Sequence, residues 1–221
     1  MFIDKAKVHL EIKFDAPLNR NDSYDWLSKY QIIAYTISSE GRKQFEVARA
    51  SIIFLDGDIN LNIKGSSLPM ACDAHSEEIY NLYETIFDEN EEIIKKPLDQ
   101  IIHPYIWYID YLYVHSNFRR NGLGTAILEW IMNFLCRYQG AVIALPCSIE
   151  LKNSDLGYLE LISIDDEELK SQTKRFLNRN KFYFLEDTPY MYHLLEWESG
   201  TSDFRGKGRQ LNNVLYLFEE R

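Results

Sequence analysis

The sequence predicts an α/β (α+β) fold in which a mixed, mostly antiparallel sheet is flanked by helices. Three observations carry this prediction: alternating strand patterns near the start, one long helix with an apolar stripe, and a short, wholly apolar strand after it. A hydrophobic content of 46% with 14% aromatic residues excludes disorder of the whole chain. The 221 residues predict a single domain over 1–221, with an N-terminal strand extension (about 1–27) and a C-terminal tail (about 198–221).

The first part of the chain is predicted to form antiparallel strands followed by one helix. Residues 7–14 alternate apolar and polar side chains, as a half-buried strand does. Residues 31–37 and 45–55 are rich in Ile, Val, Phe and Tyr and are separated by a turn-like segment, so they predict two more strands. Residues 73–89 place apolar side chains three and four apart, which predicts one amphipathic helix.

A strand, helix and strand are predicted in the middle of the chain. Residues 105–115 form an aromatic-rich strand, residues 122–138 form the longest helix with Gly140 as its stop, and residues 141–145 form a buried strand. An acidic stretch follows, to which no strand is assigned. A helix over 167–180 and strands over 182–185 and 190–197 complete the prediction, and the short apolar run at 214–218 has no assigned role.

Charge and cysteine content limit the partners. The chain carries 24 Lys and Arg against 34 Asp and Glu, a net charge of -10, which argues against a nucleic-acid partner and an anionic membrane. Residues 73–100 hold nine acids against two lysines, so a cationic acceptor is expected if they flank a cleft; otherwise they form a solvated surface. Three widely spaced cysteines and no stretch of membrane-spanning length predict a reducing, cytoplasmic location.

The start of the helix at 122 has the features of an anion site. The sequence there is Arg119-Arg120-Asn121-Gly122-Leu123-Gly124-Thr125. A helix N-terminus leaves backbone N–H groups without partners, and the two glycines allow a diphosphate to approach them while the arginines add charge. A plain tight turn with surface arginines is the alternative that the residues leave open.

Other chemistries find no support in the sequence. A dinucleotide fingerprint would need glycine or alanine where Ile127 stands, and residues 200–208 have the wrong spacing for a phosphate loop. The five histidines show no metal-ligand spacing, so no metal is expected, and no serine-hydrolase elbow occurs.

The segment from Ile109 to Leu128 resembles the signature of the GNAT superfamily of acyl-CoA-dependent N-acyltransferases, [Q/R]-x-x-G-x-[G/A] after the fourth strand. The later order of elements, through residue 197, is also similar. The resemblance implies that acetyl-CoA is the acyl donor and that a primary amine of a small molecule or protein attacks it directly in a ternary complex. It further implies a set of cofactor-binding residues, whose backbone holds the pantetheine arm and then the pyrophosphate: Leu112, Tyr113 and Val114, then Arg119, Arg120, Asn121, Gly122, Leu123, Gly124 and Thr125.

Asp110 is the candidate catalytic residue. Alternation places it on the same strand face as Leu112 and Val114, in the interior of the sheet, where burial raises the pKa of a carboxyl group and suits it to accept a proton. The resemblance implies that an acid at this position acts as the general base. The alternative is a purely structural Asp110 that pairs with an arginine or a backbone donor.

Three departures from the family pattern bear on the function. Leu177 stands where many members have a tyrosine that protonates the leaving thiolate, Lys181 stands where glycine is usual, and His115-Ser116 replaces a frequent proline. A thiolate whose conjugate acid has a pKa of about 8.5 needs little help to leave. The departures keep a second function open, a non-catalytic acyl-CoA-binding or interaction module.

The aromatic Trp107, Tyr111 and Tyr113 are expected to pack in the sheet rather than line a pocket. The oligomeric state, a homodimer included, stays open.

Overall fold

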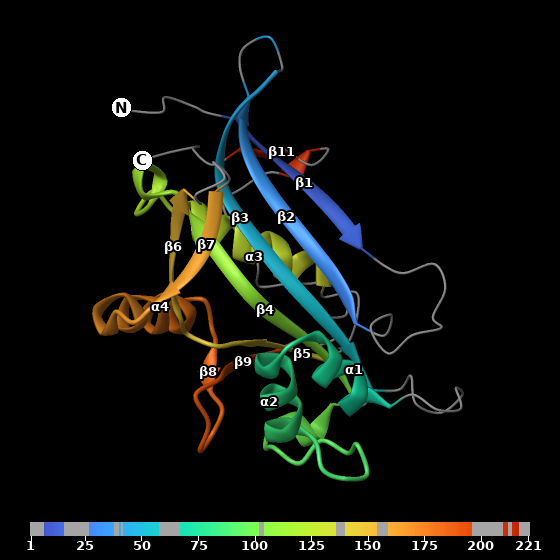
Figure 1. Cartoon of the computed structure of the whole chain (residues 1–221). Coiled ribbons are helices and arrows are strands. Elements are labelled where there is room, and N and C mark those ends of the chain that lie inside the picture. Colours follow the sequence, from blue (N-terminus) through green and yellow to red (C-terminus); the bar gives the residue numbers. More distant parts are fainter. Residues whose placement is uncertain are drawn as a thin grey trace.

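A computed structural model gives the fold around a nine-stranded sheet of order β10-β11-β1-β2-β3-β4-β5-β9-β8 (Figure 1). It describes residues 7–15, 27–37, 40, 42–57, 67–101, 104–135, 140–153, 159–195, 210–211 and 214–216. Neighbouring strands are antiparallel except for the parallel pair β4 and β5. The predicted fold class, a mixed and mostly antiparallel sheet with flanking helices, is confirmed.

The first three strands form where the sequence predicts them. They are β1 (Lys7–Asp15), β2 (Ser28–Ile37) and β3 (Lys43–Asp56). Their β-branched and aromatic side chains suit a pleated surface, and the antiparallel ladders run along nearly their full length.

The amphipathic helix predicted over 73–89 is confirmed as α2 (Glu77–Ile86), but its predicted extent is wrong, because a separate helix, α1 (Leu68–His75), precedes it. Ser76 separates them with an extended backbone, and its side chain accepts a hydrogen bond from the backbone N–H of Ile79. This is N-capping, which supplies a partner to an otherwise unpaired helix donor. The short helix η3 (Leu98–Gln100) follows before the sheet resumes.

The predicted strand, helix and strand are confirmed as β4 (Tyr105–Val114), α3 (Leu123–Leu135) and β5 (Gly140–Ala144). The turn η4 (Ser116–Phe118) links the first two, and residues 136–138 of the predicted helix lie outside the described residues. Gly140 opens β5 rather than ending the helix. Its φ is 141°, and a Cβ there would lie 2.2 Å from the carbonyl oxygen of Tyr105, so a glycine is required where the two strands meet.

The acidic stretch contains a hairpin that was not predicted. Its strands are β6 (Ser148–Asn153) and β7 (Leu159–Ile164), which pair antiparallel in a sheet of their own. The helix α4 (Glu167–Arg179) follows, then β8 (Tyr183–Phe184) and β9 (Met191–Leu195). The last two are shorter than predicted, and residues 196–197 lie outside the described part.

The apolar run in the tail joins the sheet. The strands β10 (Gln210–Leu211) and β11 (Val214–Tyr216) pair with each other, and β11 pairs antiparallel with β1. Segments far apart in the chain are therefore neighbours (Figure 1). Residues 217–218 of the predicted run lie outside the described residues. Among the helices that the structure describes, none has the length and apolar character needed to cross a membrane.

Two hydrophobic clusters cover the two faces of the sheet. One contains Trp107 of β4 with Ile127 and Ile131 of α3, and the other contains residues of α1 and α2 with Tyr108 of β4. Trp107 is 1% exposed and stacks on Phe54 at 4.2 Å between ring centroids, so its predicted packing role is confirmed. The two layers of helices hold β4 between them.

Candidate active site

The parallel strands β4 and β5 part halfway along β4. The two strands pair from Ile106 with Ala141 to Ile109 with Ala144, and there β5 ends. Strand β4 continues to Val114 and pairs over this part only with β3 on its other side. The free edge of β4 borders a cavity of about 490 Å³. An unpaired strand edge offers N–H and C=O groups to a ligand, so this opening is a suitable binding site for an extended chain.

The cavity brings together most of the predicted site residues. Asp110 lines it together with eight of the ten predicted cofactor-binding residues, namely Leu112, Tyr113, Val114, Arg119, Arg120, Gly122, Gly124 and Thr125. Asn121 is exposed outside this lining, and Leu123 is 3% exposed in the hydrophobic core. Tyr113 and Tyr111 line the cavity, so the expectation that these aromatics only pack the sheet is wrong for both.

The loop before α3 has the backbone of an anion-binding turn. Arg120 has a φ of 63° and Gly122 a φ of 79°, and the N–H of Ala126 donates to the carbonyl of Gly122 at 2.9 Å to begin the helix. The N–H groups of the preceding turn have no helical acceptors and are available to a ligand. Arg119 is held in place, because its Nε donates to the carbonyl of Val114 at 2.8 Å and its guanidinium lies 5.6 Å from the Tyr113 ring centroid.

The two glycines of this loop have different roles. Gly122 needs its positive φ, and no atom lies within 4 Å of the position that a Cβ would take. At Gly124 a Cβ would lie 3.4 Å from Cε2 of Phe176 and 3.5 Å from Cγ2 of Val114. Gly124 therefore faces α4 and the end of β4, and its small size sets how closely α4 packs over the start of α3.

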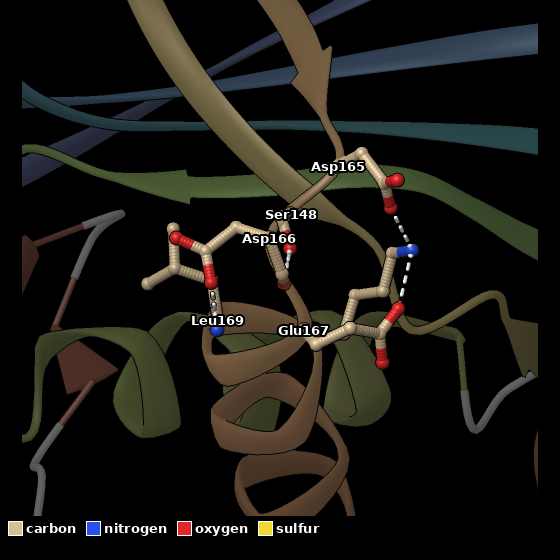
Figure 2. A network of polar contacts seen from close by, with 6 residues as sticks. Ser148, Asp165, Asp166, Glu167 and Leu169 are labelled. Atoms are coloured by element: carbon tan, nitrogen blue, oxygen red, sulfur yellow. Dashed lines mark hydrogen bonds and ion pairs between the residues drawn. The ribbon is translucent and has the colours of Figure 1, made fainter.

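Polar contacts fix the beginning of α4 beside the cavity (Figure 2). The carboxylate of Asp166 caps the helix by accepting from the N–H of Leu169 at 3.0 Å, and the Ser148 hydroxyl donates to the Asp166 carbonyl at 2.8 Å. Lys170 donates to the carboxylates on either side of Asp166, at 2.6 and 2.9 Å. Because Ser148 opens β6, these bonds join the hairpin to the helix that forms one wall of the cavity.

The α4 wall was not predicted from the sequence. Thr173, Phe176 and Arg179 follow one another at intervals of three residues and line the cavity, as does Leu177, which is 5% exposed at the position where the resemblance implies a tyrosine. The interval of three is a helical spacing that places side chains on one face. This period was the signal available in the sequence, but it does not show which neighbour the face contacts.

Asp110 lies at a β-bulge. Ser51 of β3 pairs with Tyr111 whereas Ile52 pairs with Ile109, so Asp110 is an extra residue without a partner in the ladder. Ile109 and Leu112 consequently pack into the same cluster although they are three residues apart. The predicted regular alternation of Asp110 with Leu112 is therefore wrong, and so is its predicted place in the interior. Its side chain is 27% exposed.

The carboxylate of Asp110 pairs with a lysine. Nζ of Lys29 lies 3.4 Å from Oδ2 of Asp110. His75 of α1 lies close enough to interact with both charges. Burial of His75 and the charge of Lys29 lower its pKa, while the charge of Asp110 raises it. The sequence offered no sign of this arrangement, because its three members come from β2, α1 and β4.

Two uncharged proton donors also line the cavity. Burial, with a smaller contribution from Glu78 and Asp110, raises the pKa of the Cys147 thiol to about 11. Burial likewise raises the pKa of Tyr111, although Arg49 opposes the shift. Both groups therefore keep their protons at neutral pH.

Residues 79–154 match the family model described as the acetyltransferase (GNAT) family. This stretch includes the glycine loop together with β4, α3 and β5, so the resemblance noted in the sequence is confirmed there. No curated protein and no solved structure matches the chain.

Proposed function

We propose, on the premise that residues 79–154 form a GNAT acetyltransferase segment, that the protein transfers an acetyl group from acetyl-CoA to a primary amine. The family match supports acyl transfer in general. The donor, the acceptor and the residue roles that follow are our proposal.

The observation that carries the proposal is the separation of β4 from β5 beside the loop that opens α3. The free edge of β4, from Asp110 to Val114, suits the amide-bearing pantetheine arm, which can pair with it as another strand would. The turn at Arg120 and Gly122 suits the pyrophosphate, since helix N-terminal N–H groups and arginines bind anions. Both halves open into one cavity, as a single CoA molecule requires.

Positive charge gathers at one end of this cavity although the chain is acidic as a whole. Arg119, Arg120 and Arg179 all line it, the first two from the loop and the third from the last turn of α4. Arg179 lies one helical turn beyond Phe176, which faces Gly124, so the two residues share one face of α4, and both line the cavity. We therefore include Arg179 among the phosphate ligands.

The proposed reaction is direct attack. The acceptor ammonium gives a proton to Asp110, and its nitrogen then attacks the thioester carbonyl carbon. The C–N bond forms, the C–S bond breaks, the electrons of that bond leave with the CoA thiolate, and the second proton of the nitrogen passes to solvent water. An N–H group on the β4 edge stabilises the oxyanion during the step. Leu177 supplies no proton to the thiolate, whose conjugate acid has a pKa of about 8.5 and which leaves without protonation.

We expect the acceptor to be cationic. Asp110 lines the cavity, and Glu78 of α2 lies close enough to the cavity-lining Cys147 to contribute to its raised pKa; Glu78 also accepts a hydrogen bond from the buried Tyr108 hydroxyl. The net charge of -10 draws cations to the protein. Polyamines, aminoglycosides and lysine side chains are the acceptor classes that fit this charge.

A second candidate function is acyl-CoA binding without turnover. It is favoured by Leu177, which cannot donate a proton, and by the lysine that already pairs with Asp110. Both candidates share the same CoA site and differ only in chemistry.

Calorimetry with CoA and acetyl-CoA, followed by a panel of primary amines assayed for CoA release, tests the proposal. We expect binding of both nucleotides and release of CoA with at least one cationic amine. Binding without release across the panel would favour the non-catalytic function, and no binding to folded protein would reject both.

The Arg179→Gln variant should bind CoA about tenfold more weakly, since a charged hydrogen bond contributes about 1.5–3 kcal/mol. Its control, Arg175→Gln on the same helix outside the lining, should bind CoA as the parent does.

A further inference from the structure

We propose that Lys29 is a self-acetylation site, modified by the same cavity that binds acetyl-CoA. This inference rests on the proposed function, since it requires an acyl-CoA in the cavity. The observation behind it is that a primary amine of the chain already pairs with Asp110, the cavity-lining carboxylate that the proposed function makes the general base.

The position of Lys29 follows from the sheet. It lies on β2, two strands from β4, with β3 between them, and pairs with Ile53 of β3. Two strand spacings amount to about 10 Å. The lysine and aspartate side chains extend toward each other and together span this distance. The Lys29 side chain therefore crosses β3 and reaches the bulge. There Nζ lies 3.4 Å from Oδ2 of Asp110.

The environment of this pair suits a reacting amine. The Lys29 side chain is 35% exposed, so it is neither locked in the core nor free in solvent. Asp110 lines the cavity at the point where β4 leaves β5, next to the strand edge proposed to hold the thioester arm. His75, whose pKa is lowered by burial and by Lys29, adds a neutral imidazole beside the pair.

Other ion-paired lysines do not share this placement. Lys43 pairs with Glu11 of β1, and Lys170 pairs with the carboxylates at the start of α4. None of these carboxylates lines the cavity. An ion pair with a carboxylate is therefore common to all three lysines, and contact with a cavity-lining carboxylate distinguishes Lys29 from the other two.

The chemistry balances without a further reactant. The Lys29 ammonium transfers a proton to the Asp110 carboxylate, and the neutral Nζ attacks the carbonyl carbon of acetyl-CoA. The new bond joins Nζ to the acetyl carbon, the C–S bond breaks, CoA leaves as the thiolate, and the second proton of Nζ passes to solvent water. The product is an N-acetyl-lysine that has lost its charge, so Asp110 loses its cationic partner.

The test is mass spectrometry of peptides after the purified protein is incubated with acetyl-CoA and no amine acceptor. We expect acetylation of Lys29 to approach one group per chain, about tenfold or more faster than at Lys43, with Asp110→Asn slowing it by at least that factor. Lys29→Arg, which keeps the positive charge and hence the ion pair, should abolish the modification, and Lys43→Arg should leave it unchanged.

A mixing experiment separates self-acetylation from acetylation between molecules. A mass-labelled Asp110→Asn chain incubated with the parent protein should stay unmodified at Lys29, because the reaction uses the carboxylate of its own chain. Lys29 acetylation no faster than that of Lys43 would overturn the inference, as would equal rates in the parent and in Asp110→Asn. If amines are acetylated while Lys29 is not, this inference alone fails. If calorimetry detects no acetyl-CoA binding, the proposed function fails with it.

Discussion

At the scale of single residues, the most informative feature is that Asp110 has no ladder partner. A bulge frees a side chain from the constraints of the regular sheet and turns it toward a site. Here it brings a carboxylate to the edge of the cavity while the neighbouring Ile109 stays in the core. The strand β4 therefore keeps its packing in the core, while its one extra residue, Asp110, presents a carboxylate to the cavity.

Asp110→Asn should lower kcat for amine acetylation by about 10²- to 10⁴-fold, because the amide cannot accept the ammonium proton. The affinity for CoA should stay the same, since only the backbone of Asp110, which the substitution keeps, belongs to the strand edge proposed for the pantetheine arm. Steady-state kinetics and calorimetry measure the two effects. Glu11→Gln removes an ion-paired carboxylate of similar exposure on β1 and is the matched control. Equal kcat in Asp110→Asn and the parent would exclude Asp110 as the base.

The Cys147 thiol should react slowly with alkylating reagents at neutral pH. Its pKa of about 11 means that the thiolate fraction, and with it the alkylation rate, rises about tenfold per pH unit until that value is approached. Peptide mass spectrometry in a Cys136→Ser background follows the reaction, and bound CoA should slow it because Cys147 lines the cavity. A rate that levels off near pH 9 would contradict this environment.

At the scale of secondary-structure elements, helix α4 forms one wall of the cavity. Its start is tied to β6 through Ser148 and Asp166 (Figure 2). Its second half packs on Gly124 through Phe176. The helix is otherwise highly charged, so its attachment depends on few contacts. Loss of one of them should therefore affect binding as well as stability.

Asp166→Ala should destabilise the protein by about 1 kcal/mol, the usual effect of losing an N-cap, and should also weaken CoA binding. Ser76→Ala removes the N-cap of α2, which does not line the cavity, and is the matched control. We expect similar losses of unfolding free energy in urea for both variants and a weaker CoA affinity only for Asp166→Ala. A loss of affinity in both would show a general effect of stability.

The elements with strong local signals were predictable from the sequence. The stripe of α3 and the glycines before it marked the central strand, helix and strand, because periodicity and backbone freedom are local properties. The hairpin β6–β7 was missed because its acids concealed an alternation with Ile149 and Leu151. Ser76 followed by two glutamates was a capping signal that the apolar spacing obscured.

The missed parts of the site are non-local. The contact between Lys29 and Asp110 joins residues 81 positions apart, and no pattern in either segment announces it. The bulge was equally hidden, because an extra residue in a strand is defined by the register of the neighbouring strand. The local glycine and arginine pattern of the loop before α3 was therefore easier to recognise in the sequence than the contact between Lys29 and Asp110.

At the scale of the whole molecule, an acidic protein has a cavity with an arginine-rich end. The net charge of -10 favours the approach of cations, whereas the anionic CoA of the proposed function would need Arg119, Arg120 and Arg179, which line the cavity, to offset that field. The two substrates should therefore differ in their response to salt.

Raising the ionic strength from about 0.01 M to about 0.15 M shortens the screening length from about 30 Å to about 8 Å. We expect the KM for a polyamine to rise severalfold and the KM for a monoamine to rise less, because the attraction scales with the charge of the acceptor. Steady-state kinetics at saturating acetyl-CoA measures both. Equal changes for the two amines would show that the field of the protein does not select the acceptor.

The bulge makes the site depend on the number of residues in β4 as well as on their identity. A chain shortened by one residue at position 110 would regain an unbroken ladder with β3, in which Leu112 and Val114 keep their partners and their faces, but it would lose the carboxylate. The number of residues in this segment therefore decides whether any side chain stands outside the ladder. Variant libraries that aim to alter acceptor choice should therefore substitute freely around Asp110 while holding the length between Trp107 and Val114 constant.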